Sequence, residues 1–265
     1  MLRNGAREKA LSRKVMLSLL MAGVMSICIS GGDAWASDIV TLTQDTTYNT
    51  PSELDKQHIS MNGYNIVSNI ILNADNAGMS ITGTGKESLT INCEGLQFAV
   101  AAQSNNNAKV LISNVKDVNI KGNVTSDSLV HSNIDGGIIF DKVGFFNIET
   151  EKNIGLHAQG GLISIDANEV SINSKNENAI WAQLSNCIGD YPSDVKIKSS
   201  GNIILQSTSS TAVGAANMDG NVTDNKVTVD LQGKNINVIS EKSTGLMSND
   251  IQFQTGKTSI ILNAD

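Results

Sequence analysis

The stretch FNIETEKNIGLHA (residues 146–158) places two short apolar segments on either side of a polar turn, and the chain contains six versions of this pattern. Each version starts with an apolar pair and ends with a second apolar segment that includes a small residue. The six segments are LTINCEGLQFAVAA, VNIKGNVTSDSLVH, FNIETEKNIGLHA, VSINSKNENAIWA, IILQSTSSTAVGA and INVISEKSTGLMS. Self-similarity with a period of a few tens of residues indicates a repeat architecture, so this pattern decides the fold.

The spacing within the repeat is nearly constant. The second residue of each first pair, which we term the anchor, is Ile91, Ile120, Ile148, Ile172, Leu205 and Val238. After 8 or 9 residues each anchor is followed by the next apolar position, at Val100, Leu129, Leu156, Ile180, Val213 and Leu246. A third apolar pair completes each unit, at Val110/Ile112, Ile138/Phe140, Ile163/Ile165, Val195/Ile197, Val227/Val229 and Ile260/Leu262. The length variation falls before the third pair, in stretches rich in Gly, Asn and Asp that we predict to be loops.

Apolar residues alternate with other residues in every segment, which indicates strands with one face in a core. The residue between the first apolar pair is polar in five of the six units; the members of this set are Thr90, Asn119, Asn147, Ser171, Ile204 and Asn237. Three strands per unit, repeated head to tail, predict an all-β fold, a right-handed single-stranded parallel β-helix (solenoid) over residues 67–265. Successive coils would stack in register about 4.8 Å apart, with Asn, Ser and Thr at the corners. An antiparallel sandwich or barrel would instead need hairpin turns between neighbouring strands.

The N-terminal 36 residues have the pattern of a signal peptide. Five basic residues precede an apolar run (residues 15–30), and AWA (residues 34–36) provides a cleavage site after Ala36. A membrane anchor is the alternative, but the run is shorter than the roughly 18 residues that span a bilayer. Residues 37–66 depart from the repeat, and we predict that they form an N-terminal cap over the first coil.

The C-terminal residues raise a different question. IILNAD occurs at residues 70–75 and again at residues 260–265, where it forms the third strand of an ordinary coil. We therefore expect an open edge there and a chain that is a fragment of a longer protein.

Charge limits the partners. The leader holds five of the 19 basic residues and two of the 26 acidic ones, so residues 37–265 carry 14 basic and 24 acidic residues and no Arg. Such a surface is a poor match for nucleic acid or for anionic membranes. No other stretch is long and apolar enough to form a membrane-spanning helix, which predicts an exported soluble chain or one tethered by another part.

The spacing of the Cys and His residues in the sequence predicts neither a disulfide nor a catalytic histidine. Cys93 and Cys187 would lie about 14 Å apart along the stack, too far for a disulfide, so we expect two buried thiols. We place His131 in the inward column of the second strand, with Ala158, and His157 in the outward column.

Carboxylates at Asp127, Asp135 and Asp141 have no matching acids in adjacent coils, and no serine-protease or zinc spacing is present. The sequence thus predicts a non-enzymatic chain without catalytic residues, cofactor or metal ligands.

One column favours recognition. The outward column of the second strand is more apolar than the other faces and reads Ala101, Val130, His157, Trp181, Gly214 and Met247. We take Val130, His157, Trp181 and Met247 as a possible partner-binding stripe. The alternative is that the long loops fold over it.

The leader, the atypical opening segment and the Asn/Ser/Thr-rich coils with their GLHA, AIWA and AVGA strands resemble the passenger domains of bacterial autotransporters over residues 37–265. The resemblance implies export across the inner membrane and passage through the outer membrane by a C-terminal barrel, which this sequence does not contain and which we expect in a missing part. It implies a rod on the cell surface, an adhesin for a protein or glycan ligand of host or neighbouring cells. A β-helical polysaccharide lyase or hydrolase whose active site lies elsewhere is the alternative.

Overall fold

The computed structural model divides by its internal contacts into two units, Met1–Ala36 and Ser37–Asp265. It describes residues 39–50, 58–74, 78–103, 108–184, 191–217, 226–250 and 257–264. The predicted signal peptide lies outside these residues. Across the described ranges the chain forms 22 β-strands and no helix, which confirms the all-β class. The described residues therefore contain no helix that is long and apolar enough to cross a membrane.

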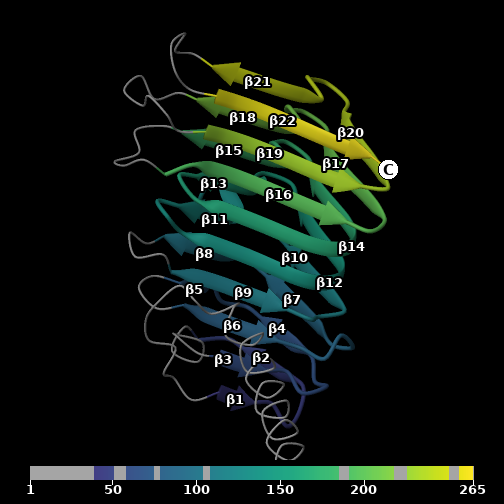
Figure 1. The fold of residues 1–265 in the computed structure, drawn as a ribbon. Coiled ribbons are helices and arrows are strands. Elements are labelled where there is room, and N and C mark those ends of the chain that lie inside the picture. The colour runs from purple at the N-terminus through teal and green to yellow at the C-terminus, as the bar shows by residue number, and fades with distance from the viewer. Residues whose placement is uncertain are drawn as a thin grey trace, which may run out of the picture. The chain divides into compact units, whose positions relative to one another are not determined.

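The strands form two parallel sheets, and from β4 onward each turn of the chain contributes to both (Figure 1). On one side of the 15-stranded sheet lie the first strands of the coils: β2 (Thr46–Tyr48), β4 (Ile66–Ser68), β7 (Ser88–Asn92), β10 (Asp117–Lys121), β17 (Asn202–Ser207) and β20 (Asn235–Ser240). On its other side lie the third strands: β1 (Ile39–Thr41), β3 (His58–Ser60), β6 (Met79–Thr82), β9 (Lys109–Ser113), β16 (Ser193–Ser199), β19 (Lys226–Gly233) and β22 (Lys257–Ala264). Two long strands, β12 (Gly137–Thr150) and β14 (Leu162–Ser174), run round the corner and join both sides.

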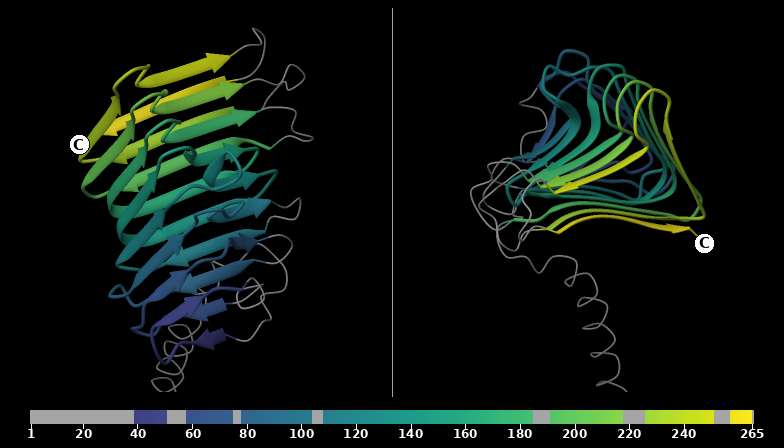
Figure 2. Two further views of the ribbon diagram at one scale, coloured as in Figure 1. Left: turned by 180° about the vertical axis from the view of Figure 1, so that it is seen from behind. Right: turned by 90° about the horizontal axis from the view of Figure 1, so that it is seen from above.

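The 7-stranded sheet contains the second strands of the coils. These are β5 (Leu72–Ala74), β8 (Val100–Gln103), β11 (Ser128–Asn133), β13 (Ile154–Gln159), β15 (Ile180–Leu184), β18 (Val213–Asn217) and β21 (Leu246–Asp250). Seen along the stack, the described strands follow a three-sided path (Figure 2, right). This arrangement fits an all-β parallel solenoid.

The anchors form one continuous file, by which we mean residues paired in register from coil to coil. Ile120 pairs with Ile91 below and Ile148 above, and the file continues through Ile172, Leu205 and Val238. The predicted stacking of the anchors is thus confirmed. The six residues that each lie between the two members of a first apolar pair, from Thr90 to Asn237, also share one file, on the opposite face of the sheet.

Two positions differ from the predicted alignment. The partner of Val100 and Leu156 is Val130, one residue beyond the predicted Leu129, because the corner before β11 contains one extra residue. The partners of Val195 and Ile197 are Val229 and Leu231, two residues beyond the predicted pair. In both places a polar stretch of variable length precedes the strand. The spacing from the preceding strand therefore does not predict the register of the next one.

The corners show the expected polar chemistry. Asn62 and Asn114 have left-handed backbone, with φ of 50° and 54°. The amide of Asn92 donates to Asn69, and that of Asn69 donates to Asn49, at 3.0 and 2.7 Å. Such a ladder of like side chains links successive coils.

Three further predictions can be compared with the structure. Within residues 37–66, expected to be a cap, β1 pairs with β3 and β2 pairs with β4, so the described part of this segment already contributes strands to the stack. The described parts of the two IILNAD copies differ in place: Leu72–Ala74 of the first form β5 in the 7-stranded sheet, and residues 260–264 of the second lie in β22 in the 15-stranded sheet. Cys93 is a free buried thiol whose pKa burial raises to about 12, while Cys187 lies outside the described residues.

Candidate functional site: an Asp–His–His cluster on the second sheet

The outer side of the 7-stranded sheet has a file of its own, which we call the outer file. It reads Asn73, Ala101, His131, His157, Trp181, Gly214 and Met247. Three residues of the predicted stripe, His157, Trp181 and Met247, lie in it. The placement of Val130 was wrong: it faces inward, is fully buried, and His131 takes its place in the outer file.

Exposure changes along the outer file. His131 and His157 are only 5% and 2% exposed, although they lie on the outer side of the sheet. Phe98, from the turn before β8, stacks on the His131 ring with centroids 4.9 Å apart. Trp181 and Met247 are partly exposed. The predicted stripe is therefore covered at its histidine end and accessible at its Trp181 end.

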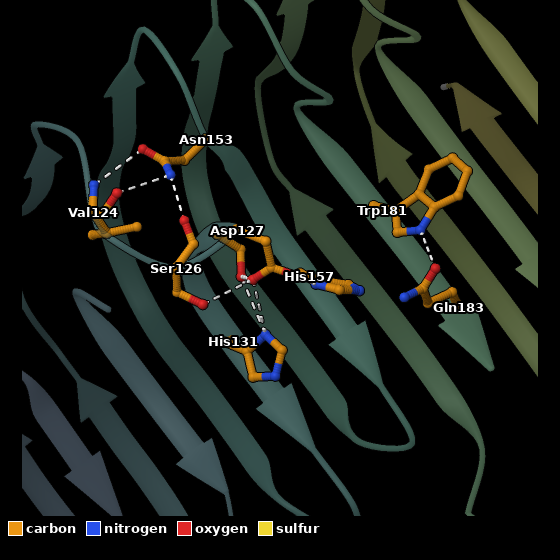
Figure 3. Close-up of polar contacts among 9 residues, drawn as sticks. Val124, Ser126, Asp127, His131, Asn153, His157, Trp181 and Gln183 are labelled. Atoms are coloured by element: carbon orange, nitrogen blue, oxygen red, sulfur yellow. Dashed lines mark hydrogen bonds and ion pairs between the residues drawn. The ribbon is translucent and has the colours of Figure 1, made fainter. Parts of the chain in front are cut away.

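Asp127 meets the two histidines and completes a cluster (Figure 3). Its Oδ2 lies 2.9 Å from His157 Nδ1, and its Oδ1 lies 3.8 Å from His131 Nδ1. The two rings are edge to face with centroids 5.1 Å apart. One atom from each of the three residues lies within 4.8 Å of the other two. Two imidazole nitrogens and one carboxylate oxygen are thus gathered at one point.

Ser128 joins Asp127 to His131. Its hydroxyl donates to Asp127 Oδ1 at 2.9 Å and lies 3.1 Å from His131 Nδ1. Ser126 donates to the same carboxylate oxygen at 3.3 Å. Asp127 Oδ1 is therefore oriented by two hydroxyls, which leaves Oδ2 toward His157.

His157 is incompletely satisfied. Neither of its ring nitrogens makes an aligned hydrogen bond with any described residue, even though Nδ1 is only 2.9 Å from Asp127. We read that contact as an electrostatic one whose direction departs from the N–H axis, because hydrogen-bond strength falls steeply with misalignment. A buried polar nitrogen without a partner costs about 1–3 kcal/mol, so native proteins rarely leave one without a reason.

The charges of the cluster follow from its surroundings. Burial lowers the pKa of His131 to about 4, and the nearby His157 acts in the same direction against the opposing effect of Asp127. Burial would raise the pKa of Asp127, but the contact with His157 and the hydrogen bond from Ser128 hold it well below its usual range. At neutral pH the cluster therefore contains an ionised carboxylate and a neutral imidazole at His131.

The loop that carries Asp127 is fixed by Asn153, which lies in the corresponding corner of the next coil (Figure 3). The Asn153 side chain accepts from Val124 N at 3.0 Å and donates to the carbonyls of Val124 and Ser126 at 3.2 and 2.7 Å. Asn153 is 5% exposed. A single buried amide thus adds to the backbone hydrogen bonds of this corner, such as Thr125 N to Leu96 O and Ile154 N to Asp127 O.

Trp181 packs against Gly214 of the next coil. A Cβ on Gly214 would lie 2.1 Å from the indole ring, so glycine is required for this packing. The indole Nε1 donates to Gln183 Oε1 at 2.7 Å (Figure 3). The ring presents an apolar surface from a fixed position.

Sequence reasoning missed the cluster because it counted nine residues from Ile120 to the second strand. That count put His131 on the inward side and separated it from His157. The available signal was the similarity of LVHSN (residues 129–133) to GLHAQ (residues 155–159), which aligns the histidines and puts Ser132 opposite Ala158.

No match is found when the chain is compared with known family models, with curated proteins or with solved structures. Its function must therefore be argued from its own residues.

Proposed function

We propose that the chain is the rod of an exported cell-surface protein similar to an autotransporter passenger domain, and that it acts in adhesion or cell-to-cell contact without catalysis. On this proposal the coils form a right-handed single-stranded β-helix, since crossovers between parallel strands are overwhelmingly right-handed. The leader, the acidic arginine-free surface and the stacked coils support it. The ligand is a protein or glycan on a host or neighbouring cell.

The observation that carries this proposal is the accessible end of the outer file. Trp181 lies on Gly214 with its ring fixed, and Met247 follows one coil further on. Trp residues dominate the binding energy of many interfaces because they bury a large area at a small cost in entropy. A rigid sheet face with a fixed indole can serve as such an anchor.

Replacement of the indole tests the proposal. Beads coated with the purified chain are added to epithelial monolayers and, separately, to one another, and bound beads are counted. We expect Trp181→Ser to reduce attachment about tenfold, since loss of an aromatic anchor costs 1.4 kcal/mol or more.

The matched control is Ile204→Ser, which removes an exposed apolar side chain (37% exposed) from the 15-stranded sheet. It should leave attachment unchanged. Equal attachment by the wild type and a folded Trp181→Ser chain in both assays would remove the role of this face, and with it the proposal.

A further inference from the structure

We propose that Asp127, His131 and His157 form a binding site for a divalent transition metal ion, with Zn²⁺ as the best fit. This inference goes beyond the adhesive function and is independent of it. It starts from the donor set of one carboxylate and two imidazoles, which suits zinc and its neighbours in the first transition row. Calcium and magnesium prefer sites made of oxygen atoms alone.

The distances suit a small ion. Zinc binds imidazole nitrogen and carboxylate oxygen at about 2.0–2.2 Å, so two ligands of a tetrahedral site lie about 3.3 Å apart. Asp127 Oδ2 lies 2.9 Å from His157 Nδ1, Asp127 Oδ1 lies 3.8 Å from His131 Nδ1, and one donor atom from each of the three residues lies within 4.8 Å of the other two. On this proposal, rotations of the side chains bring the three donor atoms to about 3.3 Å from one another around the ion.

The unsatisfied nitrogen is the second, independent observation. His157 is 2% exposed and its Nδ1 faces the carboxylate without an aligned hydrogen bond. An ion between Nδ1 and Asp127 would give this nitrogen the partner that the described residues do not supply. The ion would therefore bind at His157 Nδ1, next to the Asp127 carboxylate.

The surrounding structure can hold such an ion in place. His131 and His157 are register partners in β11 and β13, so the parallel ladder fixes their backbones relative to each other. Phe98 stacks on one ring, and Ser128 donates to the carboxylate. Supporting contacts of this kind orient metal ligands and tune their affinity.

The site has an entrance. The side chain of Asp127 is 49% exposed while the imidazoles are buried. An ion would arrive from the carboxylate side and keep a coordination position toward solvent. Three protein ligands and one open position is the arrangement of zinc sites that bind water or a further ligand.

Titration with zinc alone tests the site. The full chain is purified without a histidine tag, dialysed against chelator and titrated with zinc chloride by calorimetry. We expect one ion per chain. Ser128→Ala removes a supporting group and should weaken zinc binding roughly tenfold. Asp127→Asn, His131→Gln and His157→Gln each remove a ligand and should weaken zinc binding by more than that.

The control is His58→Gln, which removes the one histidine of the chain that is outside the cluster. His58 lies in β3, and its replacement should leave zinc binding unchanged. Circular dichroism checks that each variant is folded. If His157→Gln fails to fold, the wild type is loaded with Co²⁺, whose visible spectrum should show tetrahedral nitrogen and oxygen ligands and resist an excess of Ca²⁺. The site is refuted if wild-type binding is no stronger than that of a folded Asp127→Asn, His131→Gln double variant.

Discussion

At the scale of single residues, Glu87 shows how one carboxylate can fix a corner of the coil. It is 1% exposed. Its two oxygens accept from the amide and hydroxyl of Thr84, both at 2.7 Å, and from Lys86 N at 3.0 Å. They also accept from Gly63 N, in the coil below, at 2.6 Å. One side chain thus binds its own turn and the preceding coil.

These contacts make stability depend on pH. Burial would raise the pKa of Glu87, but the hydrogen bonds from Thr84 and Lys86 outweigh it and lower the pKa from 4.5 to about 2. A carboxyl with a lower pKa in the folded state contributes stability that is fully present above pH 4.5 and is lost as the pH falls toward 2. Each tenfold change in acidity is about 1.4 kcal/mol, so the contribution at neutral pH is about 3 kcal/mol.

We therefore expect Glu87→Gln to lower the free energy of unfolding by about 3 kcal/mol at pH 7, because the amide cannot accept all four hydrogen bonds. The difference from the wild type should shrink as the pH falls below 4.5. Urea unfolding at a series of pH values measures both effects. Glu177→Gln, at an exposed site, should stay within about 0.5 kcal/mol; a pH-independent loss at Glu87 would contradict the electrostatic explanation.

Residues differ in how well the sequence predicts them. Ile120, Ile148 and Ile172 could be placed because a strand core needs only alternation, and alternation is visible in one dimension. Glu87 and Asp127 could not, since each depends on a partner more than 20 residues away whose position is fixed only when the coils stack.

At the scale of elements, strands were predictable and the corners between them were not. The ladder imposes a period of two on every strand. A corner imposes no period, and one extra residue before β11 moved His131 to the other face of the predicted strand. The cluster arises where this corner, residues 122–127, brings Asp127 next to the histidines of the outer file.

Asn153 is the residue that holds this corner, and its removal gives an element-scale prediction. Asn153→Ala breaks three hydrogen bonds to Val124 and Ser126 in a buried position. The expected cost is about 2–3 kcal/mol of unfolding free energy, because the freed backbone groups have no new partner. Since Asp127 would lose its fixed position, the affinity for zinc should fall as well. Calorimetry and urea unfolding on the same samples measure the two changes.

The matched control is Asn173→Ala, which truncates an exposed asparagine of β14. It should leave both quantities unchanged within error. Asn153→Ala with wild-type stability would mean that the corner holds its shape without the amide, and our account of how Asp127 is positioned would then be wrong.

At the scale of the folded unit, stability is nearly one-dimensional. Each coil pairs only with the coil before it and the coil after it along the sheets, as in other repeat proteins. The files of Ile, Val and Leu are interchangeable between coils because each position repeats the same environment. The chain should therefore tolerate the loss of a whole coil but not of part of one.

The long strands β12 and β14 allow a sharp test of this idea, because Phe146 pairs with Val170. Deletion of residues 146–169, which are 24 residues, puts Val170 over Val118 and Ile172 over Ile120, so every file continues. We expect a folded chain that unfolds cooperatively, with about a seventh less strand signal by circular dichroism. Deletion of residues 146–168 is the matched control. It leaves one residue more, which puts Glu169 over Val118 and Ser171 over Ile120, so polar side chains enter the core and the chain should lose several kcal/mol or fail to fold. If the two deletion variants unfold at the same urea concentration, the corners can accommodate an extra residue without loss of stability. The files would then not determine how the coils stack.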